Sequence, residues 1–303
     1  MAFATGGFHG LSYVKEQTFG TTPATPTMEA LRHTSCSLVL SKDSFQSAEL
    51  RSDAQIVDMR MGANQVSGDI GIELSYGEYD DFLAAAVRGS WSENTLKAGI
   101  QVPYFTIERV FNDINQYQVF KGCAVNTFNL SIQSNAIVTG TIGVVGKSSS
   151  ISGTTIATST STSSMHSPLD SFSGTLTEND LPVATITGIE LNINNGINPA
   201  FVIGSPDAAA LLPARINVSG TVSAYFSDLT LLNKFINEEE SNLAITLGPS
   251  SGPSYKIILP RIKYTGGSNA VSNEGAIQLD MPFQAVYDEV EQTNITITRT
   301  PGE

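Results

Sequence analysis

Cysteine, histidine and basic residues are all scarce in this chain of 303 residues. Two cysteines, Cys36 and Cys123, are too few for a disulfide framework, and we expect both to be thiols that pack as small hydrophobic side chains. Sixteen lysines and arginines stand against 29 aspartates and glutamates, which gives a net charge of −13. Because a surface that grips phosphates needs positive charge, this balance argues against tight nucleic-acid binding.

Long hydrophobic runs are also missing. No stretch approaches the roughly 18 apolar residues that a membrane-spanning helix needs, and residues 1–10 lack the basic region and apolar core of a secretory signal. We therefore expect a chain with no membrane partner that stays in a cytosol. A composition of 41% hydrophobic and 15% charged residues is that of a globular protein, and the length suits two ordinary domains.

Motifs that carry catalytic or metal chemistry are equally rare. Residues 248–252 have the letters of a nucleophile elbow centred on Ser250, but a proline and a strand follow where a helix is required. We interpret them as a hairpin turn and not as the site of a serine hydrolase. His9, His33 and His166 have no second ligand at metal spacing. We predict no enzyme activity, no cofactor and no metal site.

Three further groups of polar or aromatic residues have structural interpretations. Residues 238–240 are three glutamates without the spacing of a cation-binding loop, so we expect a solvated surface. Asp80 and Asp81 suit the positive end of a helix dipole. Trp91, the only tryptophan, is expected to pack beside that helix.

The most informative stretch is a strand that leads into a short helix, and it occurs twice. Residues 66–74 begin Val-Ser-Gly and then alternate apolar and polar side chains, as a strand with one buried face does. Gly77 breaks the strand, and residues 82–86 are good helix formers. A second Val-Ser-Gly opens the strand at 218–228, and a helical segment follows at 229–236.

The two copies are separated by a constant distance along the chain, which indicates a duplication. Three pairs of positions share an offset of about 152 residues: Leu38 and Leu191, Gly68 and Gly220, and Arg109 and Arg261. We therefore predict a mainly β fold of the α+β kind. It consists of two tandem modules, each of packed antiparallel sheets (a β-sandwich or barrel) flanked by a short helix.

Changes in composition divide the chain into four segments. Residues 1–27 are rich in glycine, proline and threonine and are predicted to be an extended N-terminal arm. Residues 28–147 are the first predicted module, and within them residues 44–52 are a polar connection. Residues 148–181 are a Ser/Thr-rich linker or long loop that buries little apolar surface. Residues 182–303 are the second predicted module.

Taken in order, several motifs resemble those of the tail tube (major tail) proteins of long-tailed bacteriophages. The resemblance covers most of the chain and rests on the order and spacing of nine short stretches. They are Ser12-Tyr13-Val14-Lys15-Glu16, Phe19-Gly20-Thr21-Thr22-Pro23, Val66-Ser67-Gly68, Tyr79-Asp80-Asp81-Phe82-Leu83, Ile107-Glu108-Arg109, Phe120-Lys121-Gly122, Val218-Ser219-Gly220, Leu259-Pro260-Arg261-Ile262 and Ala285-Val286-Tyr287-Asp288. It implies orthogonally packed antiparallel sheets beside a helix. It also implies a structural virion protein whose rings stack as a tube for genome ejection.

The resemblance further implies partners. Single-module relatives form six-membered rings, so two modules per chain predict trimeric, pseudo-sixfold rings, with hexameric rings as the alternative. Tape measure and tail-tip or terminator proteins are expected at the tube, which is assembled in the host cytoplasm, and double-stranded DNA is expected to pass an acidic lumen without specific binding. We expect the arm and the Ser/Thr-rich loop to lock one ring to the next. A carbohydrate-binding or adhesin-type β module of a virion or cell surface stays open as a second function.

Overall fold

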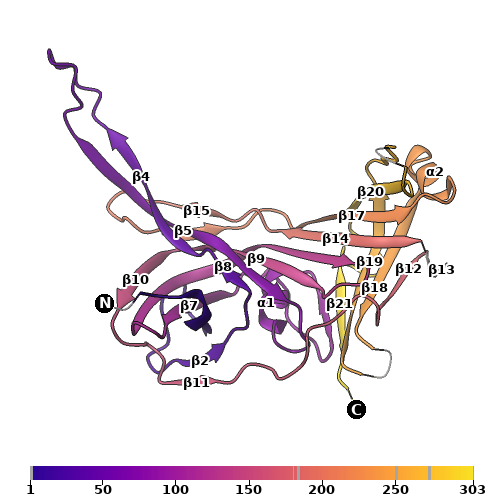
Figure 1. Cartoon of the computed structure of the whole chain (residues 1–303). Helices are drawn as coiled ribbons and strands as arrows, with labels where there is room; N and C mark the ends of the chain where they lie inside the picture. Colours follow the sequence, from indigo (N-terminus) through magenta and orange to yellow (C-terminus); the bar gives the residue numbers. More distant parts are fainter. Residues whose placement is uncertain (1–2, 180, 183–184, 250–251, 272–273, 303) are drawn as a thin grey trace.

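The chain folds into antiparallel β-sheet with two short helices, as the sequence predicted (Figure 1). The computed structural model describes residues 3–179, 181–182, 185–249, 252–271 and 274–302. Neither of the two helices in this part of the chain is long and apolar enough to cross a membrane. The sheet dominates because alternation with a period of two runs through most of the sequence.

Residues 9–152, called the first half below, form two layers of sheet. One layer contains, in spatial order, β1 (His9–Glu16), β7 (Tyr104–Phe111), the start of β8 (Gln116–Gln133) and β10 (Ser148–Ser152). The other layer contains β3 (Ser35–Cys36) and β4 (Val39–Gln46) at its edge, then β5 (Met59–Glu73), β9 (Thr139–Gly146) and the end of β8. Strand β8 serves both layers and carries a bulge between Val125 and Thr127, where a strand bends and twists more strongly.

Residues 175–300, called the second half, repeat this order of pairing. The places of β1, β7, β8 and β10 are taken by β12 (Thr175–Glu178), β18 (Glu240–Leu247), β19 (Ser254–Tyr264) and β21 (Thr296–Thr300). The places of β3–β4, β5 and β9 are taken by β14 (Ile186–Asn194), β17 (Asn217–Tyr225) and β20 (Gln278–Ala285). Every pairing named for either half is antiparallel.

The remaining short elements lie at the margins of these layers. They are η1 (Gly6–Phe8), β2 (Thr27–Ala30), β6 (Thr95–Lys97), β11 (Ser159–Ser161), β13 (Leu181–Pro182), β15 (Asn198–Ala200) and β16 (Ala210–Leu212). Strand β2 pairs with β1, and β11 pairs in parallel with β2. Strand β6 of the first half pairs with β21 of the second half.

The two Val-Ser-Gly sequences occupy equivalent places in the two halves. Val39 lies opposite Ser67, and Asn192 lies opposite Ser219 in the same register. The third predicted pair differs, because Arg109 lies in β7 whereas Arg261 lies in β19, the counterpart of β8. The reason is a difference in length: residues 87–103 separate the first helix from β7, whereas residues 237–239 separate the second helix from β18.

The two helices follow equivalent strands but are buried to different extents. Helix α1 (Asp80–Ala86) starts with two carboxylates that suit its positive end, and it buries Phe82, Leu83, Ala85 and Ala86. Phe82 stacks on Phe105 with ring centroids 5.1 Å apart. Helix α2 (Thr230–Ile236) has no fully buried residue.

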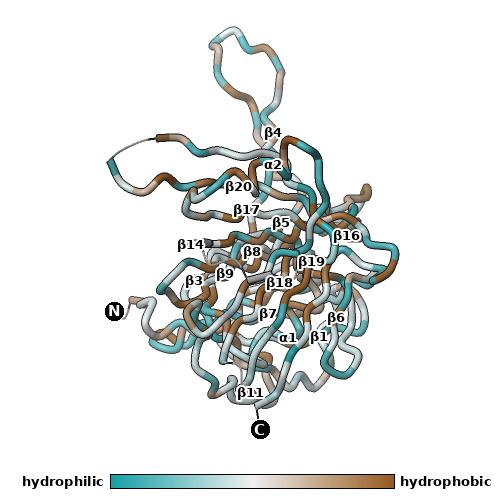
Figure 2. The backbone as a smooth tube through the Cα atoms, turned by 90° about the vertical axis from the view of Figure 1, so that its right-hand side faces the viewer, coloured by the Kyte–Doolittle hydropathy of each residue, from teal (hydrophilic) through white to brown (hydrophobic). Residues whose placement is uncertain are grey.

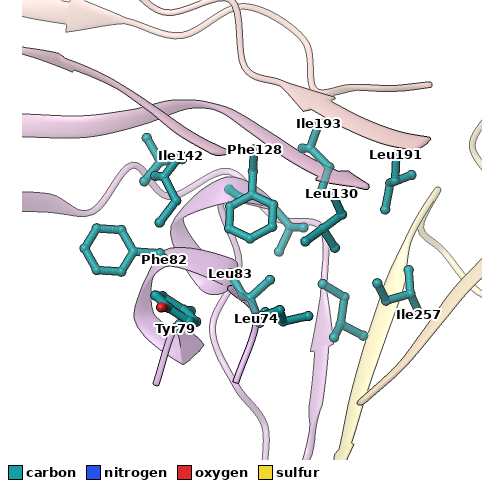
Figure 3. Close-up of a cluster of buried hydrophobic side chains, with 14 of the residues drawn as sticks. Leu74, Tyr79, Phe82, Leu83, Phe128, Leu130, Ile142, Leu191, Ile193 and Ile257 are labelled. Atoms are coloured by element: carbon teal, nitrogen blue, oxygen red, sulfur yellow. The ribbon is translucent and has the colours of Figure 1, made fainter. Parts of the chain in front are cut away.

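One hydrophobic core runs through both halves, because the end of β8 pairs with β14 and fuses their sheets. Figure 3 shows Leu83 of α1 close to Leu130 of β8, with Leu191 and Ile193 of β14 and Ile257 of β19 on the side of the second half. A continuous core of this kind couples the stability of the two halves, since removing one side exposes the apolar surface of the other.

The predicted N-terminal arm contains a strand of the core sheet. Strand β1 pairs with β7 along its whole length, and Leu11 and Tyr13 are buried. The arm interpretation of residues 1–27 is therefore wrong for residues 9–16. Three consecutive buried positions, 11–13, hide the alternation that marks a strand with one solvated face.

The Ser/Thr-rich segment is also paired for much of its length. Residues 148–181 contain β10, β11 and β12, which pair with β8, β2 and β18. Strand pairing uses backbone groups, so a segment with few apolar side chains can still complete a sheet edge. Both carboxylate oxygens of buried Glu108 hold the segment, since they accept bonds from Thr155 and from the amide of Ile156. Glu78 likewise accepts the amides of Arg32 and Ser164.

Candidate functional site: a concave acidic sheet face and two hairpins

The polar face of the fused sheet is hollow. Its strands, from β3 through β5, β9, β8, β14 and β17 to β20, line an open concavity of about 790 Å³. Alternation sends Phe128, Leu130 and Ile132 of β8 into the core, so Asn129 and Ser131 face the concavity. The other strands of this sheet follow the same rule.

Small polar side chains form rows across this face. Asn129 lies opposite Thr141 on β9 and opposite Asn192 on β14, and Asn192 lies opposite Ser219 on β17. The side-chain amide of Asn192 donates a short hydrogen bond to the side-chain oxygen of Asn129. These rows cross the boundary between the two halves without a break.

The central strands of this face carry charge of one sign, and Lys263 of the neighbouring β19, opposite Gln284, pairs with Glu240. Residues 67–73 of β5, residues 127–133 of β8 and the whole of β9, β14, β17 and β20 include no lysine or arginine. They carry four carboxylates, all on the polar face: Asp69, Glu73, Glu190 and Asp280. Glu190 lines the concavity itself, and the other three carboxylates lie around it on the same polar face. Tyr225 is the one aromatic residue at the outward positions of these described strand segments, so they offer no platform of several rings.

A long hairpin formed by β4 and β5 projects from the body, where the sequence analysis expected only a polar connection (Figure 1). Its outer part exposes a row of large apolar side chains: Phe45, Leu50, Ile56, Val57, Met59 and Met61. Figure 2 shows hydrophobic and hydrophilic positions interleaved along this hairpin. Exposed apolar groups on a projecting hairpin indicate a contact surface. Sequence reasoning missed it, although Phe45, Met59 and Met61 are unusual in a polar connection.

A second hairpin, β15–β16, occupies the equivalent connection of the second half, between β14 and β17. It exposes Phe201, Val202, Ile203 and Leu212. The two hairpins touch, because the amide of Asn64 donates to the carbonyl of Pro206 at 2.7 Å and its side chain bonds Asp207 at 2.5 Å. Both point to the same side of the body in Figure 1.

The structure brings two of the three histidines together, which sequence reasoning did not foresee. His9 Nδ1 lies 2.7 Å from His33 Nε2, and Arg109 Nε donates to His9 Nε2 at 3.1 Å. Burial, His33 and Arg109 together lower the pKa of His9 to about 4. His166 lies elsewhere, against the ring of Tyr76. No cluster of three or more metal-ligating side chains occurs among the described residues.

Asp80 and Asp81, which the sequence analysis assigned to the helix start, form ion pairs with basic side chains of the same chain. Asp80 accepts a bond from Tyr255 at 2.5 Å and forms an ion pair with Arg299, whose guanidinium lies 4.6 Å from the ring centre of Trp91. Asp81 pairs with Lys15. The contacts of Asp80 tie α1 to β19 and β21 of the second half, and the pair of Asp81 ties it to β1.

The remaining candidates from the sequence have ordinary surroundings. Of residues 238–240, Glu240 pairs with Arg261 and Lys263 on the surface. Ser250 and Ser251 lie outside the described residues, and the neighbouring Gly252 donates to Pro249 in a turn that leads directly into β19. Cys36 is half-buried and Cys123 is buried, and both are free thiols.

Comparison with known proteins agrees with this geometry. The family model described as phage tail tube protein matches residues 9–285. No curated protein matches the chain. A match over this span covers nearly all of both halves, including the concave sheet and both hairpins. The chain therefore belongs to the phage tail tube protein family, and it is a structural component of the virion.

Proposed function

We propose that three copies of this chain close into a pseudo-sixfold ring and that such rings stack into the tube through which the phage genome is ejected. The observation that carries the proposal is the recurrence of the same antiparallel pairings, in the same order, in both halves. Two tandem modules in one chain mean that three chains supply six modules. Closed rings also remove the exposed sheet edges that otherwise promote aggregation.

The acidic concave face is the natural lining of the tube. Its four carboxylates lie on strands of both modules, so a ring would present them all around the lumen. Like charge repels the phosphates of double-stranded DNA over roughly a Debye length of 8–10 Å. A lining of this sign lets DNA pass without specific binding.

The two hairpins are the elements that reach a neighbouring ring. They project to the same side, and their exposed apolar side chains lose water when they pack against another subunit. They take the role that the sequence analysis gave to the arm and the Ser/Thr-rich loop, because residues 9–16 of the arm and residues 148–152, 159–161 and 175–178 of the loop pair with other strands of their own chain. At the tube ends the same surfaces would meet tape measure and tail-tip or terminator proteins, in assembly within the host cytoplasm.

Electron microscopy of the purified chain at high concentration tests this function. We expect tubes with a regular axial repeat, and image reconstruction should find three chains in each ring. A ring of six chains would refute the trimer, and a chain that stays monomeric at every concentration would refute the tube. Glu190→Lys tests whether the acidic face lines the lumen. Tubes of this variant should retain double-stranded DNA at low salt, whereas wild-type tubes should not.

A further inference from the structure

The seam between the two halves has a defined geometry inside one chain. The end of β8 pairs with β14 from Thr127 opposite Asn194 to Gln133 opposite Gly188. The layer of the first half runs β3–β4, β5, β9, β8 and that of the second half runs β14, β17, β20, β19, so the last strand of one layer pairs with the first strand of the next. Helix α1 lies under this seam and contacts the second half through Asp80, Tyr255 and Arg299.

The counterparts of both seam strands end at open sheet edges. Strands β3 and β4, the counterparts of β14, pair with β5 on one side, and no described strand pairs with their other side. At the other end of the molecule, β18 reaches β19 only as far as Lys263, opposite Glu240. The chain beyond it, Thr265 to Ala270, is exposed and bonds β20 on one side, through Thr265 to Pro282 and Ser268 to Asp280.

This open segment follows the register of the closed seam. In the β8–β9 hairpin Thr127 lies opposite Gly143, and farther along the same pair Asn129 lies opposite Thr141. In the β19–β20 hairpin the amide of Thr265 bonds Pro282, and three residues later Ser268 lies opposite Asp280. Gly68 lies opposite Val144 and the equivalent Gly220 lies opposite Phe283, so Thr141 and Asp280 are equivalent. Their partners Asn129 and Ser268 are therefore equivalent as well.

The helices give an independent indication of the same missing contact. Helix α1, covered by the second half at the seam, buries four of its residues. Helix α2 has no such cover in its own chain, and it leaves Leu229 at its N-terminal end 54% exposed and Ile236 at its C-terminal end 63% exposed. If the second half were removed from the β8–β14 seam, α1 would be left with exposed apolar side chains next to an unpaired strand edge. Helix α2 and residues 265–270 show this arrangement.

We propose that a second copy of the chain supplies that side: its β3–β4 edge pairs antiparallel with residues 265–270, over α2, and repeats the seam that β14 makes with β8. The proposal rests on the ring of the preceding section and specifies how it closes. Asn192 faces Asn129 within one chain, so Val39 of one copy faces Ser268 of the next. Because the two edges differ, the contact is head-to-tail and generates a ring when the rotation closes.

Disulfide trapping tests the register. Val39→Cys and Ser268→Cys are combined in a Cys36→Ser background, and assembled protein is oxidised and run on a denaturing, non-reducing gel. We expect a ladder of linked chains that ends at three. Each single variant should give dimers at most, and Val39→Cys with Ile100→Cys, an exposed residue away from the seam, should give no ladder.

Imaging the same samples separates the two proposals. Rings or tubes that form without the link between residues 39 and 268 would overturn the seam and leave the tube function standing. A ladder that ends at six would keep the seam and overturn the trimer, whereas neither assembly nor link would overturn both.

A second variant tests the helix without cross-linking. Leu229→Glu with Ile236→Glu should melt as the wild type does, because neither side chain is buried, but should need at least tenfold more protein to form rings in sedimentation velocity. Ile100→Glu is the matched control and should assemble as the wild type does. Unchanged assembly of the α2 variant would overturn the role of α2.

Discussion

Gly220→Ala is expected to destabilise the fold strongly, because the strands at this point leave no room for a methyl group. A Cβ on Gly220 would overlap the carbonyl oxygen of Glu190 on β14 and lie 2.6 Å from the ring of Phe283 on β20. The equivalent Gly68 is as crowded, since its Cβ would lie 2.5 Å from the Cα of Leu38. Both Val-Ser-Gly sequences thus place glycine where a neighbouring strand crosses closely.

The size of the effect follows from what must move. Relieving the overlap requires β14 to shift away from β17, which weakens two or three backbone hydrogen bonds worth about 0.5–1.5 kcal/mol each. Displacing the Phe283 ring adds strain of the kind that overpacking produces, about 1–3 kcal/mol. Since part of this strain relaxes, we expect a loss of about 2–4 kcal/mol in the free energy of unfolding.

Urea unfolding followed by circular dichroism measures this loss, with midpoints compared at equal slope. Gly7→Ala is the matched control, because a Cβ there meets no atom within 4 Å, and it should change stability by less than about 0.5 kcal/mol. If the two variants unfold within about 1 kcal/mol of each other, the close crossing at Gly220 is not what requires glycine.

Three further predictions concern charged groups. Glu178→Ala removes the carboxylate that accepts bonds from Lys234, Ser241 and Tyr264. Because the nearly buried ammonium of Lys234 then has no counter-charge, the free energy of unfolding in urea should fall by about 3–5 kcal/mol. A fall of less than about 1 kcal/mol would contradict the burial of this pair. Arg299→Gln breaks the ion pair with Asp80 between the halves and should lower the free energy of unfolding by about 1–2 kcal/mol. Arg51→Gln is the control: its partner Asp53 lies on the exposed hairpin, so the free energy of unfolding should hardly change in the same assay. His9 has a pKa of about 4 in the folded chain and 6.5 in the unfolded chain. Between these two pH values the unfolded chain therefore binds more protons than the folded chain. The stability that neutral His9 contributes is complete above pH 6.5 and falls as the pH drops toward 4. After allowance for partial solvent exposure the loss is on the order of 1 kcal/mol; it should appear in wild-type unfolding midpoints between pH 7 and pH 4.5 and be absent from His9→Gln, and parallel pH profiles would argue against it.

The sequence alone was enough to predict the mainly β class and the strand-to-helix unit that occurs twice. Both follow from local rules: residues 69–74 alternate as one-sided strands do, and residues 80–86 are good helix formers that begin with carboxylates. The offset of 152 held between Gly68 and Gly220 because no insertion separates the first two strands of one half relative to the other. It failed at Arg109 and Arg261, since the connections after the helices differ in length.

Tertiary structure decided where polar and irregular segments go. The backbone of residues 148–152 and 159–161 finds partners in β8 and β2, which no side-chain pattern announces because hydrogen bonds of the backbone are the same for every residue. The same holds for residues 9–16, whose burial on both faces removes the alternation. Sequence periodicity reports which face of a strand is apolar and not which strand lies beside it.

The acidic concavity and the open edges belong to this second class. Asp69 and Glu190 are 121 positions apart in the sequence, and they share one face only because β8 joins β14 in a fixed register. Their charge and their outward position were fixed by residue type and alternation, whereas their gathering on one concave surface depended on the pairing of distant strands. Local interactions along the chain set the elements; contacts between residues far apart in the chain set the surface that an assembling copy or a passing DNA molecule meets.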